Sequence, residues 1–204
     1  VDQERGMLFA SSAASSTIFV IDIRDDTDLT AGFIDRNYLD IEAILLLNTT
    51  VYATGFRQVM TQPGSDRLLA LVDAPESVVQ IDISGLVDDE FGDALYNIAT
   101  GYIAAPRGNE RDDGTNTMNS VGPGQMVLHP DGHRLFVSNF NRNSVTAYDL
   151  RLGPYGMPLR EIRNVGENPY ALAISPDGNH LVVGNYTGEV EDRVSHATLG
   201  IIDI

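Results

Sequence analysis

Residues 122–150 read GPGQMVLHPDGHRLFVSNFNRNSVTAYDL, and they decide the fold. The apolar runs predict three short strands, at 125–129, 135–138 and 145–150. Between the first two strands, Pro130-Asp131-Gly132 predicts a tight turn. Proline presets φ, aspartate can accept hydrogen bonds from the backbone ahead of it, and glycine takes the positive φ that closes a short hairpin. The stretch therefore predicts an antiparallel β-meander.

The same pattern recurs in the chain. Residues 168–185, NPYALAISPDGNHLVVGN, repeat it closely, and residues 58–72, QVMTQPGSDRLLALV, repeat it with the turn glycine one position early. Each third strand also carries an aspartate in the same slot: Asp22, Asp82, Asp149 and Asp203. Because this residue recurs in every unit, we expect it to bond to the backbone of the following turn rather than to form a ring of carboxylates.

Together the repeats predict an all-β chain, a β-propeller of four-stranded antiparallel blades. The blades span about 1–54, 55–121, 122–165 and 166–204, and the first and last are partial, with about fourteen strands in all. A β-sandwich is the competing fold. It is disfavoured by the repeat and by strands that are apolar on both faces, such as 171–174, since blades pack on both sides.

Four partial blades make an arc rather than a closed ring. Two apolar end faces would then be open to water, which is unfavourable and promotes association. We therefore expect the remainder of the same propeller, or a second chain, to close the ring.

Composition sets further limits. The chain has 204 residues, 43% of them hydrophobic and none of them cysteine, so it can bury a core without disulfides and has no thiolate metal ligand or thiol nucleophile. A net charge of −16 disfavours nucleic acid as a partner. No apolar run approaches the ~18 residues of a membrane-spanning helix. The chain begins with Val1, so an export signal can already have been removed.

In a four-stranded blade, the loops between strands 2 and 3 share one face of the ring with the links from strand 4 to the next strand 1. The longer polar segments fall on this loop-rich face, which we expect to carry any binding site. Its candidate residues are Arg107, Glu110, Arg111, Asp112, Asp113, Asn116, Asn141, Arg142, Glu189, Glu191, Asp192, Arg193 and His196.

Two segments of this face suggest specific chemistry. Glu110, Asp112, Asp113 and Asn116 offer the oxygen ligands that calcium prefers, but their spacing fits no EF-hand or related repeat, so a solvated polar loop is the alternative. In 187–196, carboxylates beside a histidine can support acid–base chemistry or hold a metal, again against a solvated loop.

Other polar residues predict structural roles. His129, His133 and His180 flank turns on the opposite face and are expected to be structural rather than ligands. Asn139 and Asn185 are expected to cap the turns that follow their strands.

The segments Phe136-Val137-Ser138-Asn139 and Val182-Val183-Gly184-Asn185 stand where a known motif has Tyr-Val-Thr-Asn. The chain thus resembles the YVTN-type β-propeller repeats of bacterial and archaeal surface and periplasmic proteins, the surface-layer and YncE-like group. The resemblance implies a ring of seven blades and a periplasmic, cell-surface or secreted location. It implies no single activity, because this fold carries binding proteins, lactone hydrolases and subunits of cofactor enzymes.

Functional motifs are sparse. The sequence contains no nucleophile elbow, phosphate loop, dinucleotide fingerprint or His-Glu-x-x-His helix. The first hypothesis is a non-enzymatic, exported propeller whose loop-rich face binds a protein or another surface component. The alternatives are a lactonase-like hydrolase with a metal in the central channel and a propeller subunit of a redox enzyme.

Overall fold

The computed structural model describes residues 1–3, 5–12, 17–24, 41–46, 54–74, 76–84, 86, 99–104, 122–152, 157–186 and 197–204. Within these residues the chain forms fourteen strands and one short 3-10 helix, η1. The elements are β1 (Met7–Ser11), β2 (Thr17–Asp22), β3 (Ile41–Leu46), β4 (Thr54–Gln62), β5 (Arg67–Ala74), β6 (Glu76–Asp82), β7 (Ala99–Ala104), β8 (Pro123–Leu128), β9 (Arg134–Asn139), η1 (Phe140–Arg142), β10 (Ser144–Asp149), β11 (Met157–Arg163), β12 (Pro169–Ile174), β13 (His180–Asn185) and β14 (Thr198–Asp203).

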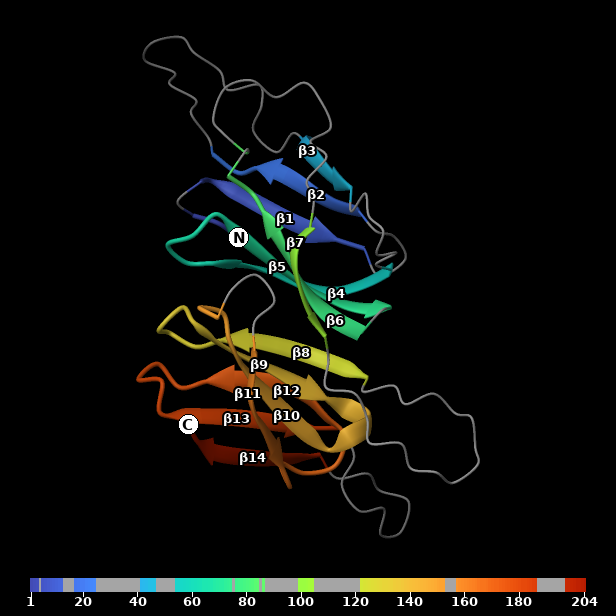
Figure 1. Cartoon of the computed structure of the whole chain (residues 1–204), viewed down its shortest axis with the longest axis vertical. Helices are drawn as coiled ribbons and strands as arrows, with labels where there is room; N and C mark the ends of the chain where they lie inside the picture. The colour runs from blue at the N-terminus through green and yellow to red at the C-terminus, as the bar shows by residue number, and fades with distance from the viewer. Residues whose placement is uncertain are drawn as a thin grey trace.

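These strands form four antiparallel sheets, each a meander of consecutive strands. The sheets are β1-β2-β3, β4-β5-β6-β7, β8-β9-β10-β11 and β12-β13-β14, here called blades 1 to 4. They stack in chain order along the long axis of the molecule (Figure 1). The expected all-β architecture, an arc of propeller blades with three, four, four and three described strands, is confirmed.

The Pro-Asp-Gly turns close their hairpins as predicted. In blade 3, Gly132 donates its backbone N–H to the His129 carbonyl at 2.9 Å and has φ of 74°. Asp131 Oδ1 accepts the amides of His133 and Arg134 at 2.8 and 3.0 Å. Because these bonds depend only on residues of the turn, the hairpin is specified locally.

Three apolar clusters hold neighbouring blades together, and inner strands such as β5 and β9 contribute alternate residues to the clusters on their two faces. Blades 1 and 2 share a cluster that includes Phe9, Ile18 and Leu68. Blades 2 and 3 share one around the buried Tyr148, and blades 3 and 4 one around Leu181. The core of this protein therefore lies between sheets.

Glutamine side chains add a hydrogen bond between the first strands of neighbouring blades. Gln58 Oε1 accepts the backbone N–H of Met126 at 2.8 Å, and Gln125 Oε1 accepts that of Leu172 at 2.7 Å. Gln58 and Gln125 occupy equivalent positions in blades 2 and 3, where blade 4 has Ala171. Each bond satisfies an amide on the strand that begins the next blade.

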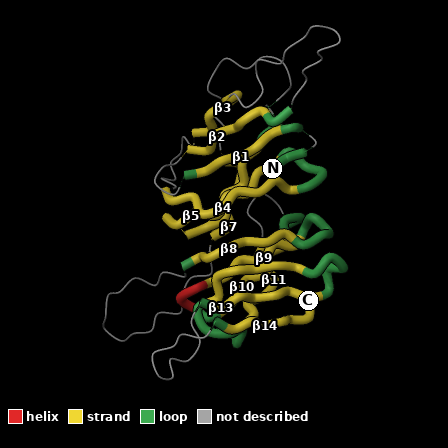
Figure 2. The backbone as a smooth tube through the Cα atoms, turned by 180° about the vertical axis from the view of Figure 1, so that it is seen from behind, coloured by secondary structure: helices red, strands yellow, loops and turns green. Residues whose placement is uncertain are grey.

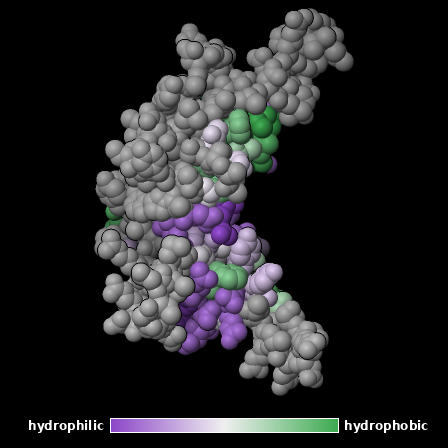
Figure 3. All heavy atoms as spheres, turned by 90° about the vertical axis from the view of Figure 1, so that its right-hand side faces the viewer, coloured by the Kyte–Doolittle hydropathy of each residue, from purple (hydrophilic) through white to green (hydrophobic). Residues whose placement is uncertain are grey.

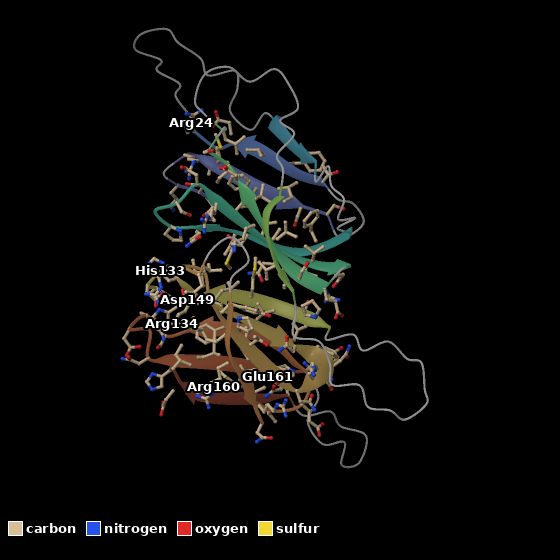
Figure 4. All side chains as sticks on the ribbon, viewed as in Figure 1. Arg24, His133, Arg134, Asp149, Arg160 and Glu161 are labelled. Carbon is tan, nitrogen blue, oxygen red and sulfur yellow. The ribbon has the colours of Figure 1, made fainter. Side chains whose placement is uncertain are left out.

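Three of the four repeated aspartates bond to the following backbone, as expected. Asp22, Asp82 and Asp149 accept the amide two residues ahead at 2.8, 2.9 and 2.9 Å. In Figure 4, Asp149 lies beside His133 and Arg134 at the edge of blade 3 that carries the Pro-Asp-Gly turn. The Arg151 guanidinium and amide, which both bond to Asp149, lower the pKa of this carboxyl to about 2.

The prediction that Asn139 and Asn185 cap turns is wrong. Asn139 Nδ2 donates across the sheet to Ser144 Oγ at 3.0 Å and to Thr146 Oγ1 at 2.8 Å, and it makes no cap bond to η1. Asn185 Nδ2 donates to the Val165 carbonyl at 3.0 Å. Both side chains are buried. Asn139 joins β9 to β10, whereas Asn185 joins β13 to the link between blades 3 and 4 and, through Thr198 Oγ1 at 3.1 Å, to β14.

Blade 4 has one packed and one open face. On the open face, register places Ala173, Val182 and Ile201 side by side, and Leu199 lies two residues further along β14 on the same face. Leu199 and Ile201 are 76% and 71% exposed. The expectation of packing on both faces thus holds for the middle blades, whereas blade 4 ends the arc, as seen from behind in Figure 2.

In the described part of the chain, no helix is long and apolar enough to cross a membrane.

Candidate functional site

A pocket of about 720 Å³ opens on the loop-rich face, where blades 2, 3 and 4 meet. Figure 3 looks onto this face, whose described residues are mostly hydrophilic around the junction of the blades. The pocket is lined by Arg57, Asp73, Glu76, Gly122, Phe140, Asn141, Tyr170 and Tyr186. We call these residues the mouth pocket; they lie near the starts of the first and third strands and near the ends of the second strands of three blades.

The repeat explains why these residues converge. Asp73, Phe140 and Tyr186 occupy one equivalent position, at or directly after the end of the second strand of their blades. Arg57 and Tyr170 occupy a second equivalent position, near the start of the first strand. In a propeller, equivalent positions surround the central axis, so residues far apart in sequence meet there.

Hydrogen bonds between blades fix the rim of the mouth pocket. Glu76 Oε1 accepts the backbone N–H of Gly122 at 2.9 Å, which ties blade 2 to blade 3. Asn143 Oδ1 accepts the backbone N–H of Asn168 at 2.8 Å, which ties blade 3 to blade 4. Gly122 has φ of 59°, a value that favours glycine. These bonds preorganise the pocket.

Three aromatic rings form one side of the mouth pocket. The Phe140 ring lies 6.5 Å from that of Tyr170 in an edge-to-face arrangement of 89°, and 6.0 Å from that of Tyr186 at 55°. Tyr170 and Tyr186 are 46% and 69% exposed. Large aromatic side chains that are partly exposed in a pocket are typical of binding sites.

Gly124 lets the first strands of blades 3 and 4 approach closely beneath these rings. A Cβ atom on Gly124 would lie 2.8 Å from Ser138 Oγ and 3.1 Å from the Cα atom of Tyr170. Ser138 Oγ in turn donates to the Tyr170 carbonyl at 2.8 Å. The position of Tyr170 is thus set by the absence of a side chain at Gly124.

Charged groups line the other side. The Arg57 guanidinium forms an ion pair with the Asp73 carboxylate, and Glu76 adds a second carboxylate. Among the lining residues that the structure describes, these three charged side chains have a formal charge of −1. The whole chain is also negative, with a formal net charge of −16 at pH 7.

The described residues include only two of the predicted site residues. Asn141 lines the mouth pocket and is exposed. The Arg142 guanidinium instead lies 3.7 Å from the carboxylate of Glu161, a residue of β11 that Figure 4 labels. The other predicted site residues lie outside the described residues: Arg107, Glu110, Arg111, Asp112, Asp113, Asn116, Glu189, Glu191, Asp192, Arg193 and His196. All four calcium candidates are among them. In the ranges that the structure covers, no three histidine or acidic side chains group closely enough to hold a metal ion.

One of the described histidines, His129, takes a structural position. His129 is buried, and its Nε2 donates to the Gly178 carbonyl of the next blade at 2.9 Å. Its Nδ1 accepts the backbone N–H of Asp131 at 3.1 Å. The structural role predicted for His129 is therefore confirmed.

Sequence reasoning missed the aromatic side of the mouth pocket. The signal was present, because Phe140 and Tyr186 each directly follow the asparagine that ends the second strand. The long polar segments gave the stronger sequence signal, because loops usually carry function. Short loops at equivalent repeat positions proved equally informative.

Comparison with solved structures agrees with this architecture. Hydrazine synthase from Kuenenia stuttgartiensis matches with a TM-score of 0.62 and 17% identity, over 97% of this chain and 43% of that one. The Cps50 (Swd1) β-propeller domain of Myceliophteria thermophila matches with a TM-score of 0.61 and 11% identity, over 98% and 50%. The periplasmic gluconolactonase of Pseudomonas aeruginosa matches with a TM-score of 0.57 and 14% identity, over 87% and 46%.

These likenesses define the class of fold: the chain is a set of β-propeller blades. It spans about half the length of the solved chains it matches. No family model and no curated protein matches the sequence.

Proposed function

We propose that this chain is part of a non-enzymatic β-propeller binding module, whose loop-rich face binds a protein or another surface component through the mouth pocket. The observation that carries the proposal is the convergence of equivalent positions from three blades into one pocket of about 720 Å³. Pockets of this size with aromatic walls and a few polar groups are typical binding sites.

The preorganisation of the rim supports binding. The Glu76–Gly122 and Asn143–Asn168 hydrogen bonds hold the pocket between blades that are themselves packed on apolar clusters. A rigid pocket loses less conformational entropy when a partner binds, so more of the contact energy becomes affinity.

Ring closure and export belong to the same proposal. The open face of blade 4 continues the packing pattern of the inner blades, and another blade would cover Leu199 and Ile201. We assign that blade to the remainder of the same propeller or to a second chain. A seven-bladed, exported protein of the YVTN type is supported by the motif resemblance.

The test is an array of peptides and cell-surface polysaccharides, probed with the protein and two variants. Tyr186→Ala removes an exposed ring of the mouth pocket, and Leu159→Ala removes a 51% exposed side chain of the outer strand β11. Ligands that bind the wild type and the Leu159 variant but not the Tyr186 variant would support the proposal.

Two results would overturn it. One is a set of ligands that the Tyr186 variant retains in full. The other is hydrolysis of gluconolactone that the substitution Glu76→Gln abolishes, because this would identify the pocket as the site of a hydrolase.

A further inference from the structure

Blade 4 forms one end of the stack of sheets, and its open face repeats an established interface (Figure 1). Blade 3 packs against blade 4 partly through Val145 and Ala147 of β10, which are both buried. Strand register places Leu199 and Ile201 of β14 at the equivalent positions, and these side chains are 76% and 71% exposed. Blade 4 thus presents to solvent the face with which blade 3 holds its own successor.

The outer edge of β14 repeats the same interface in its backbone. The Ile204 N–H donates to the Asn179 carbonyl at 3.0 Å, on the side of β13. Because backbone groups alternate in direction along an antiparallel pair, those of Leu199 and Ile201 point to the opposite edge. In blade 3 the equivalent edge of β10 pairs with β11, whereas none of the described strands pairs with this edge of β14.

One hydrogen bond that joins the inner blades stops at blade 4. Gln58 and Gln125 each accept a backbone N–H from the first strand of the next blade. The residue at their position in blade 4 is Ala171, which has no side-chain acceptor. This clamp therefore does not extend to a blade beyond blade 4.

A second inter-blade hydrogen bond stops at the same place. Gln62 Nε2 donates to the Gly132 carbonyl at 2.8 Å, and His129 Nε2 donates to the Gly178 carbonyl at 2.9 Å. Both donors directly precede the proline of a hairpin turn, and each reaches the turn glycine of the next blade. Blade 4 has Ser175 at this position, and its hydroxyl donates within its own turn.

We propose that blade 4 docks a further four-stranded blade through apolar contacts and strand pairing, without either clamp, and that this junction is the seam of the propeller. The inference rests on the ring closure proposed above and adds the chemistry of the junction. The occupant has an apolar face, like that formed by Leu172, Leu181 and Val183 of blade 4, and is preceded by a strand that pairs with β14. Since each clamp is a favourable contact between sheets, this junction opens before the clamped ones.

The test extends the chain by a second copy of residues 151–204, placed directly after Ile204. This segment carries β11 and blade 4, and Ile204 occupies the position of Leu150, so the copied β11 reaches β14 in register. Hydrogen exchange at the Leu199 and Ile201 amides is then compared between the original and the extended chain. We expect it to slow by roughly tenfold or more in the extended chain, because these amides become paired and covered.

Substitutions in the first copy of blade 4 separate face packing from strand pairing. In the extended chain, Leu199→Asn should accelerate exchange by roughly 10- to 150-fold, the equivalent of one buried leucine. Ala171→Gln supplies the missing clamp and should slow exchange by a further factor of roughly 2 to 10, whereas the control Ala171→Met has similar length but no acceptor and should not. Exchange at the Val145 and Ala147 amides of blade 3 is the internal standard, since global unfolding would accelerate it too.

The inference is overturned if the extension leaves exchange at Leu199 and Ile201 unchanged, if Leu199→Asn has no effect, or if Ala171→Gln and Ala171→Met behave alike. A dimer of the original chain in native mass spectrometry that Leu199→Asn abolishes would also overturn it, because the occupant would then be a second copy. Failure here is distinct from failure of the proposed function. Ligands on the array that require Tyr186 would preserve the binding module and refute only the seam.

Discussion

The hydrogen bond between Gln125 and Leu172 offers a measurable link between blades 3 and 4. Gln125 Oε1 accepts the Leu172 N–H at 2.7 Å, and Leu172 is only 7% exposed. Gln125→Met keeps the length of the side chain but removes the acceptor, so it leaves a buried donor unsatisfied. This should lower the free energy of unfolding by about 1–3 kcal/mol.

Two assays would measure this effect. Urea unfolding should show a lower midpoint with an unchanged slope, which indicates loss of stability without a change in the unfolded state. Hydrogen exchange at the Leu172 amide should accelerate by roughly 5- to 150-fold, the equivalent of that free energy. Gln125→Glu is the matched control, because it keeps an acceptor oxygen at the same distance along the side chain and should lose less stability.

One pattern of results would contradict a stabilising bond between Gln125 and Leu172. If Gln125→Met and the wild type unfold within about 0.3 kcal/mol of each other, and the Leu172 amide exchanges at the same rate, the bond does not join the blades. An equal loss in the Met and Glu variants would point instead to packing of the side chain.

Three further predictions follow from other contacts. Hydrogen bonds from Arg151 lower the pKa of Asp149 to about 2. The ionised Asp149 carboxylate therefore stabilises the fold fully above the ordinary carboxyl pKa near 4, and this stabilisation is lost as the pH falls through about 2. Asp149→Asn should therefore lower the melting temperature at pH 7 and match the wild type below pH 2; an equal difference at both pH values would contradict this. Gly124→Ala should cost about 1–3 kcal/mol in urea unfolding and shift the NMR signals of Tyr170, whereas unshifted signals would mean that the strands have room. Leu199→Asn should change the stability of this chain by less than about 0.5 kcal/mol but weaken its association with further blades, measured by native mass; undiminished association would exclude this face.

The blades could be predicted from the sequence because their signals are local. The turn around Asp131 and Gly132 contains every donor and acceptor that closes it, and the repeated aspartates bond only two residues ahead. Asn139 misled the prediction, since its partners Ser144 and Thr146 lie on the neighbouring strand. A side chain whose partners are set by strand register cannot be assigned from its own neighbours in sequence.

The sequence alone thus determined the meander, its turns and its repetition into an arc of propeller blades, since hairpins depend on residues close along the chain. Only the tertiary structure decided the mouth pocket. Arg57, Phe140 and Tyr186 come from three blades and meet because the blades pack around a common axis, which the apolar clusters and the inter-blade hydrogen bonds fix. Whether three such residues share one pocket depends on the angle and spacing between sheets, and these are properties of packing rather than of local sequence.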